Sequence, residues 1–222
     1  MTDVAAFDFD GTLTTGGSVL PFLAAVSDRR TVVNAIAALW PGLLHGALSG
    51  GAVADRNKER LFERVLAGVS IEHLTAVSSG FAAEHLARHL RDDVRRRFDW
   101  HRSRGDRVAI VSASPECYVR EAGALLGADT VIATQLEVAS NGSLTGRYHG
   151  KNCRGEEKLR RLQAWTGGQG PTDRLWAYGN SRGDLRMLSA ADVGVNVGRL
   201  GQLGRLRHFA GLDAAQEVGQ HD

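Results

Sequence analysis

Residues 4–14 read VAAFDFDGTLT, an apolar run that ends in two aspartates one residue apart, a glycine and two threonines. The run predicts a short buried strand, which Gly11 ends. Because side chains alternate along a strand, Asp8 and Asp10 share one side of it. Two like charges this close repel each other, and a divalent cation would offset both the repulsion and the cost of burial. By itself the stretch is equally consistent with an ordinary acidic turn, so the rest of the chain decides between the two interpretations.

The composition is that of a globular protein with a core. The chain has 222 residues, 43% hydrophobic and 23% charged, which is enough for one domain with a sizeable insertion. The net charge of +2 is too small to indicate binding to nucleic acid. Cys117 and Cys153 form no disulfide framework and lack metal-site spacing, so we expect a reduced, cytoplasmic setting. No basic segment precedes the first apolar run, so no signal peptide is expected.

The most apolar window spans residues 31–48 and contains Asn34, Pro41 and His45. Its length is marginal for crossing a bilayer. We therefore expect helices without stable membrane insertion, although this window is the best candidate in the sequence for a surface that faces lipid.

The chain between the first and second predicted strands is helical in pattern. Apolar spacing predicts helices over 19–26, 32–40 and 58–66, the second ended by Pro41, and then one long helix through 81–98. The arginines that follow residue 90 are expected on the solvated outer face of that long helix, and His101 is expected at the surface or in helix packing. These arginines are Arg91, Arg95, Arg96 and Arg97.

Strand patterns return later and alternate with helices. They fall at 107–111, 130–133, 175–178 and 193–197, and residues 136–148 read as a β-hairpin around an Asn-Gly turn. The alternation predicts an α/β fold with a Rossmann-like parallel sheet covered by helices on both faces. The helical stretch over 15–89 interrupts this alternation. We therefore predict a core of residues 1–14 and 90–222 with an inserted helical domain.

Polar clusters follow three of the predicted strands, at residues 8–12, 112–114 and 180–184. Parallel sheets bind ligands at the carboxyl ends of their strands, so these clusters are expected to meet. Lys158 begins a further helical run, which Lys151 lacks. An acidic pair, a strand-end hydroxyl, a lysine and a second acidic cluster together make a site for Mg²⁺ and phosphate, in which a carboxylate can be the nucleophile.

These residues resemble the haloacid dehalogenase superfamily of phosphohydrolases. Residues 8–14 resemble its DxDGT(L)T signature, and Val111-Ser112 its second motif. Residues 155–158 resemble the third-motif lysine, and residues 179–184 the GDxxxD motif. The helical insertion between the first two motifs resembles the phosphoserine-phosphatase-like branch, subfamily IB, with a helical C1 cap.

The resemblance implies a role for each residue. Asp8 would attack phosphorus and place its other oxygen on Mg²⁺, and Asp10 would move protons as general acid and base. The residues implied to bind the phosphoryl group or hold its loop are Thr12, Ser112, Ala113 and Lys158. The implied metal ligands are Asp8, Asp10 through its carbonyl, Asn180, and Asp184 through water.

One position departs from the family pattern. Asn180 stands where the family usually has a metal-ligating aspartate, so we expect weaker metal affinity. A catalytically weak or silent phosphate-binding protein is therefore an alternative to the phosphatase. Arg182 is expected to face solvent. A phospho-acceptor receiver domain would use similar groups, but such domains are shorter and carry their acceptor aspartate on a later strand.

The substrate is expected to be a small phosphate monoester, either phosphoserine-like or partly apolar, as in a lipid phosphate. Arg56, Lys58 and Arg60 lie in the predicted cap and would be able to recognise an anionic part of it. An exposed basic turn of helix is the simpler interpretation of these three residues. The sequence leaves the oligomeric state open.

Overall fold

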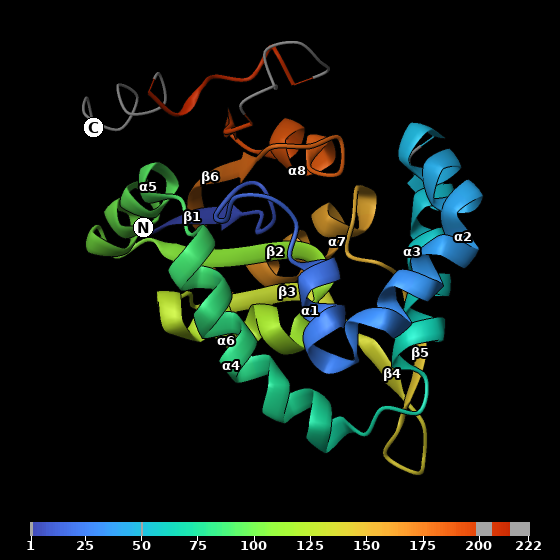
Figure 1. Ribbon diagram of the computed structural model, residues 1–222. Helices are drawn as coiled ribbons and strands as arrows, with labels where there is room; N and C mark the ends of the chain where they lie inside the picture. The colour runs from blue at the N-terminus through green and yellow to red at the C-terminus, as the bar shows by residue number, and fades with distance from the viewer. Residues whose placement is uncertain (1, 50, 199–205, 214–222) are drawn as a thin grey trace.

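A five-stranded parallel sheet forms the centre of the protein, in the order β3-β2-β1-β6-β7 (Figure 1). The computed structural model describes residues 2–49, 51–198 and 206–213. The α/β fold with a parallel sheet, predicted from the sequence, is confirmed. The strands are β1 (Thr2–Phe7), β2 (Arg107–Pro115), β3 (Thr130–Thr134), β6 (Thr172–Gly179) and β7 (Val193–Asn196).

Strand β1 lies between β2 and β6, and its residues Val4 to Phe7 have no exposed surface. A strand buried on both faces reads as a continuous apolar run, which is why residues 4–7 carry no alternation. Phe7 pairs with Ile110 on one side and with Tyr178 on the other. The segments that follow these three strands therefore leave the sheet side by side.

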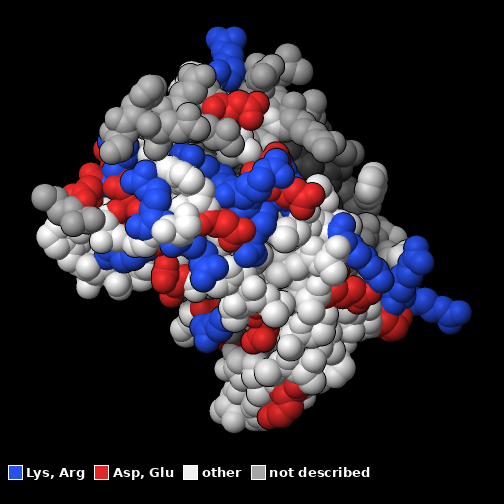
Figure 2. Space-filling view, turned by 90° about the vertical axis from the view of Figure 1, so that its left-hand side faces the viewer, with Lys and Arg blue, Asp and Glu red and all other residues white. Residues whose placement is uncertain are grey.

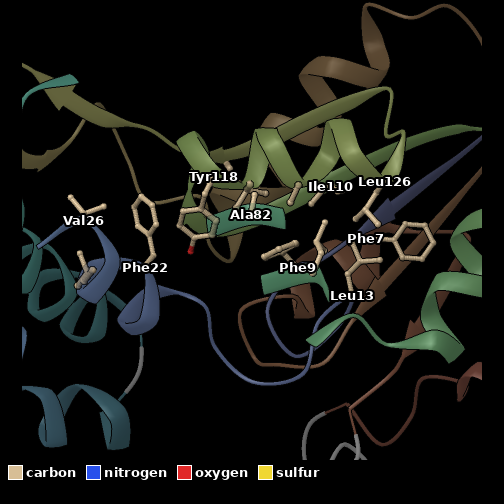
Figure 3. Packing of buried hydrophobic residues seen from close by; sticks show 14 of the residues in the cluster. Phe7, Phe9, Leu13, Phe22, Val26, Ala82, Ile110, Tyr118 and Leu126 are labelled. Atoms are coloured by element: carbon tan, nitrogen blue, oxygen red, sulfur yellow. The ribbon is translucent and has the colours of Figure 1, made fainter. Parts of the chain in front are cut away.

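Helices cover both faces of the sheet. On one face, α5 (Asp92–Ser103) and α6 (Glu116–Leu126) pack on a core that includes Phe7 and Ile110. On the other face, α7 (Glu156–Gly167) and α8 (Leu185–Ala190) cover a smaller cluster. Figure 3 shows the first core continuing past Tyr118 of α6 to Phe22 of α1 (Val19–Val26) and Ala82 of α4 (Ile71–His89).

The described residues between β1 and α5 form four helices: α1 (Val19–Val26), α2 (Arg29–Ser49), α3 (Gly51–Leu66) and α4 (Ile71–His89). The chain leaves and re-enters the core at one place, because Thr15 N donates to His89 O at 2.8 Å and Arg91 N donates to Leu13 O at 2.9 Å. The predicted hairpin is present as β4 (Leu136–Val138) and β5 (Leu144–Tyr148), and β5 packs against α3. The boundaries of the predicted core and cap stay a prediction.

Two predicted helix boundaries are wrong. Helix α2 continues through Pro41 to Ser49. Pro41 is exposed, so water can bind the carbonyl that the missing proline N–H leaves without a donor. The predicted long helix over 81–98 is instead two helices, because the chain turns at Leu90 and Arg91 to rejoin the core.

Arg97 was expected on the solvated face of its helix, and that expectation is wrong, whereas His101 takes the second of its two expected places, in helix packing. Both lie on the inner face of α5 and are at most 3% exposed. Arg97 Nε donates to Tyr178 Oη at 2.8 Å, and that oxygen is also 2.8 Å from His101 Nε2. Burial, with Arg97 nearby, lowers the pKa of His101 to about 3. A neutral His101 therefore donates from Nδ1 to Asp106 at 2.7 Å and accepts at Nε2 from Tyr178.

The face that carries α5 mixes both signs of charge, as Figure 2 shows. Arg91 pairs with Asp93, and Arg95 pairs with Asp99.

Among the described residues no helix has the length and apolarity needed to cross a bilayer.

Candidate active site

The three polar clusters meet where β1, β2 and β6 end. Asp8 directly follows β1, and its N–H donates to Tyr178 O of β6 at 2.9 Å. Ser112 lies near the end of β2 and is 1% exposed. Asn180 begins the loop after β6, which α8 follows. The site is therefore placed by strand order, since these segments are far apart in sequence.

A buried lysine joins two carboxylates at this edge. Lys158 Nζ lies 2.5 Å from Asp8 Oδ1 and 2.5 Å from Asp184 Oδ1, and all three side chains are at most 9% exposed. Burial and the neighbouring Asp184 raise the pKa of Asp8 to about 7, although Lys158 acts in the opposite direction. Burial alone would lower the pKa of Lys158, but the two carboxylates raise it above its ordinary value. One ammonium thus faces two carboxylates, and the cluster carries surplus negative charge when both are ionised.

Asp10 is held separately from Asp8. Its Oδ1 accepts from Ser18 N at 2.7 Å, and its Oδ2 accepts from Ser114 Oγ in a short contact. Ser114 N in turn donates to Ser112 Oγ at 3.0 Å. The two aspartates therefore have different partners, which suits two different chemical roles.

Sequence reasoning placed Ser114 in the strand-end cluster at 112–114 but gave it no role, and it missed Ser18 as a member of the site. Ser114 had a usable signal, because it lies two residues beyond Ser112 at the same strand end and so shares its side of the strand. Ser18 had none, since its contact with Asp10 depends on the path of the loop that leads into α1.

Gly11 allows the loop after β1 to pass close to the loop after β6. Its φ is +78°, and a Cβ at this position would lie 2.0 Å from Asn180 Nδ2. Thr12 Oγ1 lies 3.0 Å from Asp8 Oδ2 and 3.4 Å from Asn180 Oδ1. The carboxylate of Asp8 and the amide oxygen of Asn180 therefore face one shared hydroxyl.

Asp184 holds the loop that contains Asn180. Its Oδ2 accepts from Asn180 N, Ser181 N and Ser181 Oγ at 2.8 to 3.2 Å. Gly179 allows this arrangement, since a Cβ there would lie 2.5 Å from Asp184 Cβ. With Lys158 on Oδ1, both oxygens of Asp184 already have partners. Arg182 is exposed, as expected.

The oxygens at this edge are of the kind that binds Mg²⁺. In the described part of the chain no three His, Cys, Asp or Glu side chains are grouped so as to hold a metal. The expected ligands are instead the carboxylate of Asp8, the amide oxygen of Asn180 and the backbone carbonyl of Asp10. These are hard oxygen donors, and Mg²⁺ commonly completes its shell with water. The residues present therefore fit the ion.

Ala113 contributes its carbonyl to a contact from the inserted helices. Lys58 Nζ of α3 donates to Ala113 O at 2.7 Å, and Thr134 Oγ1 donates to the same oxygen at 2.9 Å. Lys58 thus points to the strand end, whereas Arg56 and Arg60 are exposed. The simple interpretation of an exposed basic turn holds for the two arginines and is wrong for Lys58.

Residues 5–189 match the family model of haloacid dehalogenase-like hydrolases. The chain belongs to this family. The match includes the three strand-end clusters and Lys158, so the resemblance seen in the motifs extends over most of the hydrolase.

The hydrolase is similar in sequence to several named proteins. It is 34% identical over 194 residues to Protein CicA of Caulobacter vibrioides strain NA1000, an alignment that covers 85% of this chain and 83% of that protein. It is 32% identical over 136 residues to a histidinol-phosphatase of Neisseria meningitidis serogroup C, covering 60% of this chain and 61% of the relative. The family and the enzyme class predicted from the sequence, a haloacid dehalogenase-type phosphatase, are confirmed.

Solved structures share the fold of the hydrolase. A Bordetella pertussis Tohama I protein of unknown function superposes with a TM-score of 0.77 at 24% identity, covering 99% of this chain and 97% of that one. A substrate-bound phosphoserine phosphatase superposes with a TM-score of 0.69 at 18% identity, covering 100% and 98%. At these identities the likeness concerns the fold alone.

Proposed function

We propose that this hydrolase is a Mg²⁺-dependent phosphatase that cleaves a small phosphate monoester through an aspartyl-phosphate on Asp8. The observation that carries the proposal is the pair of strand-end aspartates with different partners: Asp8 beside the buried Lys158, and Asp10 held by Ser18 and Ser114.

Asp8 is the nucleophile in this mechanism. One of its carboxylate oxygens forms a bond to phosphorus as the bond from phosphorus to the leaving oxygen breaks. Lys158 and Thr12 each bond a different oxygen of Asp8, so the carboxylate has a fixed orientation before the substrate arrives, as positioning catalysis requires.

Asp10 moves the protons. It gives a proton to the leaving oxygen in the first step. In the second step it takes a proton from a water molecule, whose oxygen attacks phosphorus and releases phosphate and the Asp8 carboxylate. The N–H of Ser18 and the hydroxyl of Ser114 both donate to Asp10, which holds its carboxyl group at the ends of β1 and β2.

The phosphoryl group is bound by Lys158, Ser112, the Ala113 segment and Thr12. Lys158 supplies positive charge that stays in place at every working pH, since its pKa is raised. Ser112 supplies a neutral hydroxyl at the end of β2. Phosphoryl transfer asks a protein mainly for such positioning and charge neutralisation.

Mg²⁺ would be held by Asp8, Asn180 and the carbonyl of Asp10, with Asp184 acting through water. When bound, it supplies positive charge that keeps carboxylates ionised and neutralises phosphoryl oxygens. Both oxygens of Asp184 are occupied by Lys158 and the Ser181 loop, which supports an indirect role for that residue.

The second candidate function is a weak or silent phosphate-binding protein, and Asn180 is the observation that favours it. An amide oxygen lacks the full charge of a carboxylate. The two functions differ in turnover: a silent protein binds phosphate or beryllofluoride at Asp8 without hydrolysing any ester.

The test is a Mg²⁺ titration of hydrolysis over soluble and lipid phosphate monoesters assayed side by side. We expect metal-dependent release of phosphate, which Asp8→Asn abolishes and Asp10→Asn lowers by about 10²- to 10⁴-fold. Asp173→Asn makes the same chemical change at an exposed position at the far end of β6 and should keep full activity. Undiminished turnover by Asp8→Asn would refute the mechanism, and no turnover with any ester would favour the silent protein.

A further inference from the structure

Lys58 brings a positive charge from the inserted helices to the strand end that borders the site. Its ammonium carries three hydrogen-bond donors. Within the described residues it has one hydrogen-bond acceptor, Ala113 O, which lies between Ser112 and Ser114. Its side chain also passes over Phe62, with Nζ 5.5 Å from the ring centroid. Two N–H groups of Lys58 thus remain for another partner.

The carboxylates of α3 are all engaged elsewhere. Asp55 Oδ1 accepts from Asn152 Nδ2 at 2.7 Å, Glu59 Oε1 accepts from Tyr148 N at 3.0 Å, and Glu63 pairs with Arg147 at 3.1 Å. Their spacing of four residues places them in one stripe along α3, facing β5 and the loop before α7. Helix α3 therefore offers the site an ammonium, while its acids hold the helix against the core.

The charge of Lys58 persists at neutral pH. Burial lowers its pKa to about 8, Asp10 and Asp55 act to raise it, and Arg154 acts to lower it. At pH 7 the side chain is therefore mostly protonated. A partly buried ammonium with unused donors attracts an anion more strongly than an exposed one, because water screens it less. A cationic group placed there would be repelled.

We propose that Lys58 selects phosphate monoesters whose leaving group carries a second anionic group, such as a carboxylate, over esters with a neutral or cationic leaving group. The proposal rests on the phosphatase function above and names its substrate class. It places Lys58 in substrate recognition and gives it no part in the chemical steps on Asp8 and Asp10.

The test compares three small esters of similar size with Mg²⁺ at pH 7: 2-phosphoglycolate, ethyl phosphate and phosphoethanolamine. We expect kcat/KM for 2-phosphoglycolate to exceed that for ethyl phosphate at least tenfold, with phosphoethanolamine lowest. In Lys58→Gln the kcat/KM values for 2-phosphoglycolate and ethyl phosphate should differ by less than threefold. The change should come mainly from a higher KM for 2-phosphoglycolate. Lys58→Arg should retain the preference, and Lys58→Glu should reverse it towards phosphoethanolamine. Arg60→Gln removes an exposed charge from the same helix and should keep the wild-type ratio.

Equal kcat/KM for the three esters in the wild type, or a ratio that survives Lys58→Gln, overturns the proposal while the phosphatase stands. Absence of hydrolysis of all three esters overturns this proposal, and the wider panel of soluble and lipid esters decides whether the phosphatase stands. If Lys58→Gln does not fold, as judged by thermal unfolding, the ratios of Lys58→Arg and Lys58→Glu decide the question, because opposite charges must give opposite preferences.

Discussion

Replacing the proposed nucleophile should stabilise the metal-free protein. The carboxyl group of Asp8 is buried near Asp184, so the folded state disfavours its ionised form. Asp8→Asn keeps the size of the side chain and removes that charge. We therefore expect the variant to be inactive and, at alkaline pH without metal, more stable than the wild type.

The size of the effect follows from the pKa of Asp8, which rises from 3.8 to about 7 on folding. A raised carboxyl pKa means that the folded state binds the proton more tightly than the unfolded state. The contribution of this tighter proton binding to the free energy of unfolding is complete below pH 3.8 and is lost as pH rises to 7. Each pH unit in that window costs about 1.4 kcal/mol, so the whole shift is worth up to about 4 kcal/mol.

The measurement is urea unfolding of both proteins in EDTA at pH 5 and at pH 8. Asp8→Asn does not titrate in this range, so its advantage over the wild type should grow by about 3 kcal/mol between the two pH values. Adding Mg²⁺ at pH 8 should stabilise the wild type more than the variant. Asp173→Asn serves as the exposed control and should differ from the wild type by the same amount at both pH values.

An advantage that stays constant or shrinks as pH rises would refute the reasoning. Such a result would mean that Lys158 compensates the charge of Asp8 fully, and that the site carries no surplus negative charge for a cation to offset.

Other changes test other parts of the structure. Asn180→Asp should raise Mg²⁺ affinity at least threefold in calorimetry without substrate, since it adds a charge beside Asp8. Gly11→Ala should weaken Mg²⁺ binding in the same calorimetry, because the new Cβ would meet Asn180. It should also lower the free energy of unfolding in urea by at least 1 kcal/mol, because the φ of residue 11 is +78°. Arg97→Met should lower the free energy of unfolding by about 2–4 kcal/mol, since it removes a buried hydrogen bond to Tyr178 and a stacking contact with Trp100. The control Arg96→Met, at an exposed position, should change the free energy of unfolding by less than about 0.5 kcal/mol. The preference for 2-phosphoglycolate should decline as pH rises through about 8, where Lys58 loses its proton, and kcat/KM ratios at pH 7 and pH 9 measure this.

The sheet was predictable because its central strands are buried on both faces and all its strands read as short apolar runs. The same runs placed Asp8, Ser112 and Asn180 at strand ends. Because parallel sheets bind ligands at the carboxyl ends of their strands, these residues were predicted to lie together. Helix limits were less predictable. Pro41 stops a helix only where the freed carbonyl lacks another partner, and the turn at Leu90 depends on tertiary contacts with Thr14.

The side chains missed by sequence reasoning are those whose orientation depends on distant elements. Arg97 follows Val94 and precedes Phe98 and His101 on the inner face of α5, so periodicity carried a signal, which the surrounding run of arginines obscured. Lys58 faces the end of β2 whereas Arg56 and Arg60 face solvent, and the packing of α3 against β5 sets these directions. The contact between Asp10 and Ser18 depends on a loop, for which no periodic signal exists.

The central position of β1 delays assembly of the active site during synthesis. Asp8 leaves the ribosome long before its neighbours, since β2 ends at Pro115 and β6 ends at Gly179. Until both have emerged, the nascent chain carries an apolar strand with at least one open edge, a form prone to aggregation. Nascent chains that stop before Thr172 should therefore engage chaperones through residues 4–7, and the enzyme gains its site only after β6 and Asp184 have been translated.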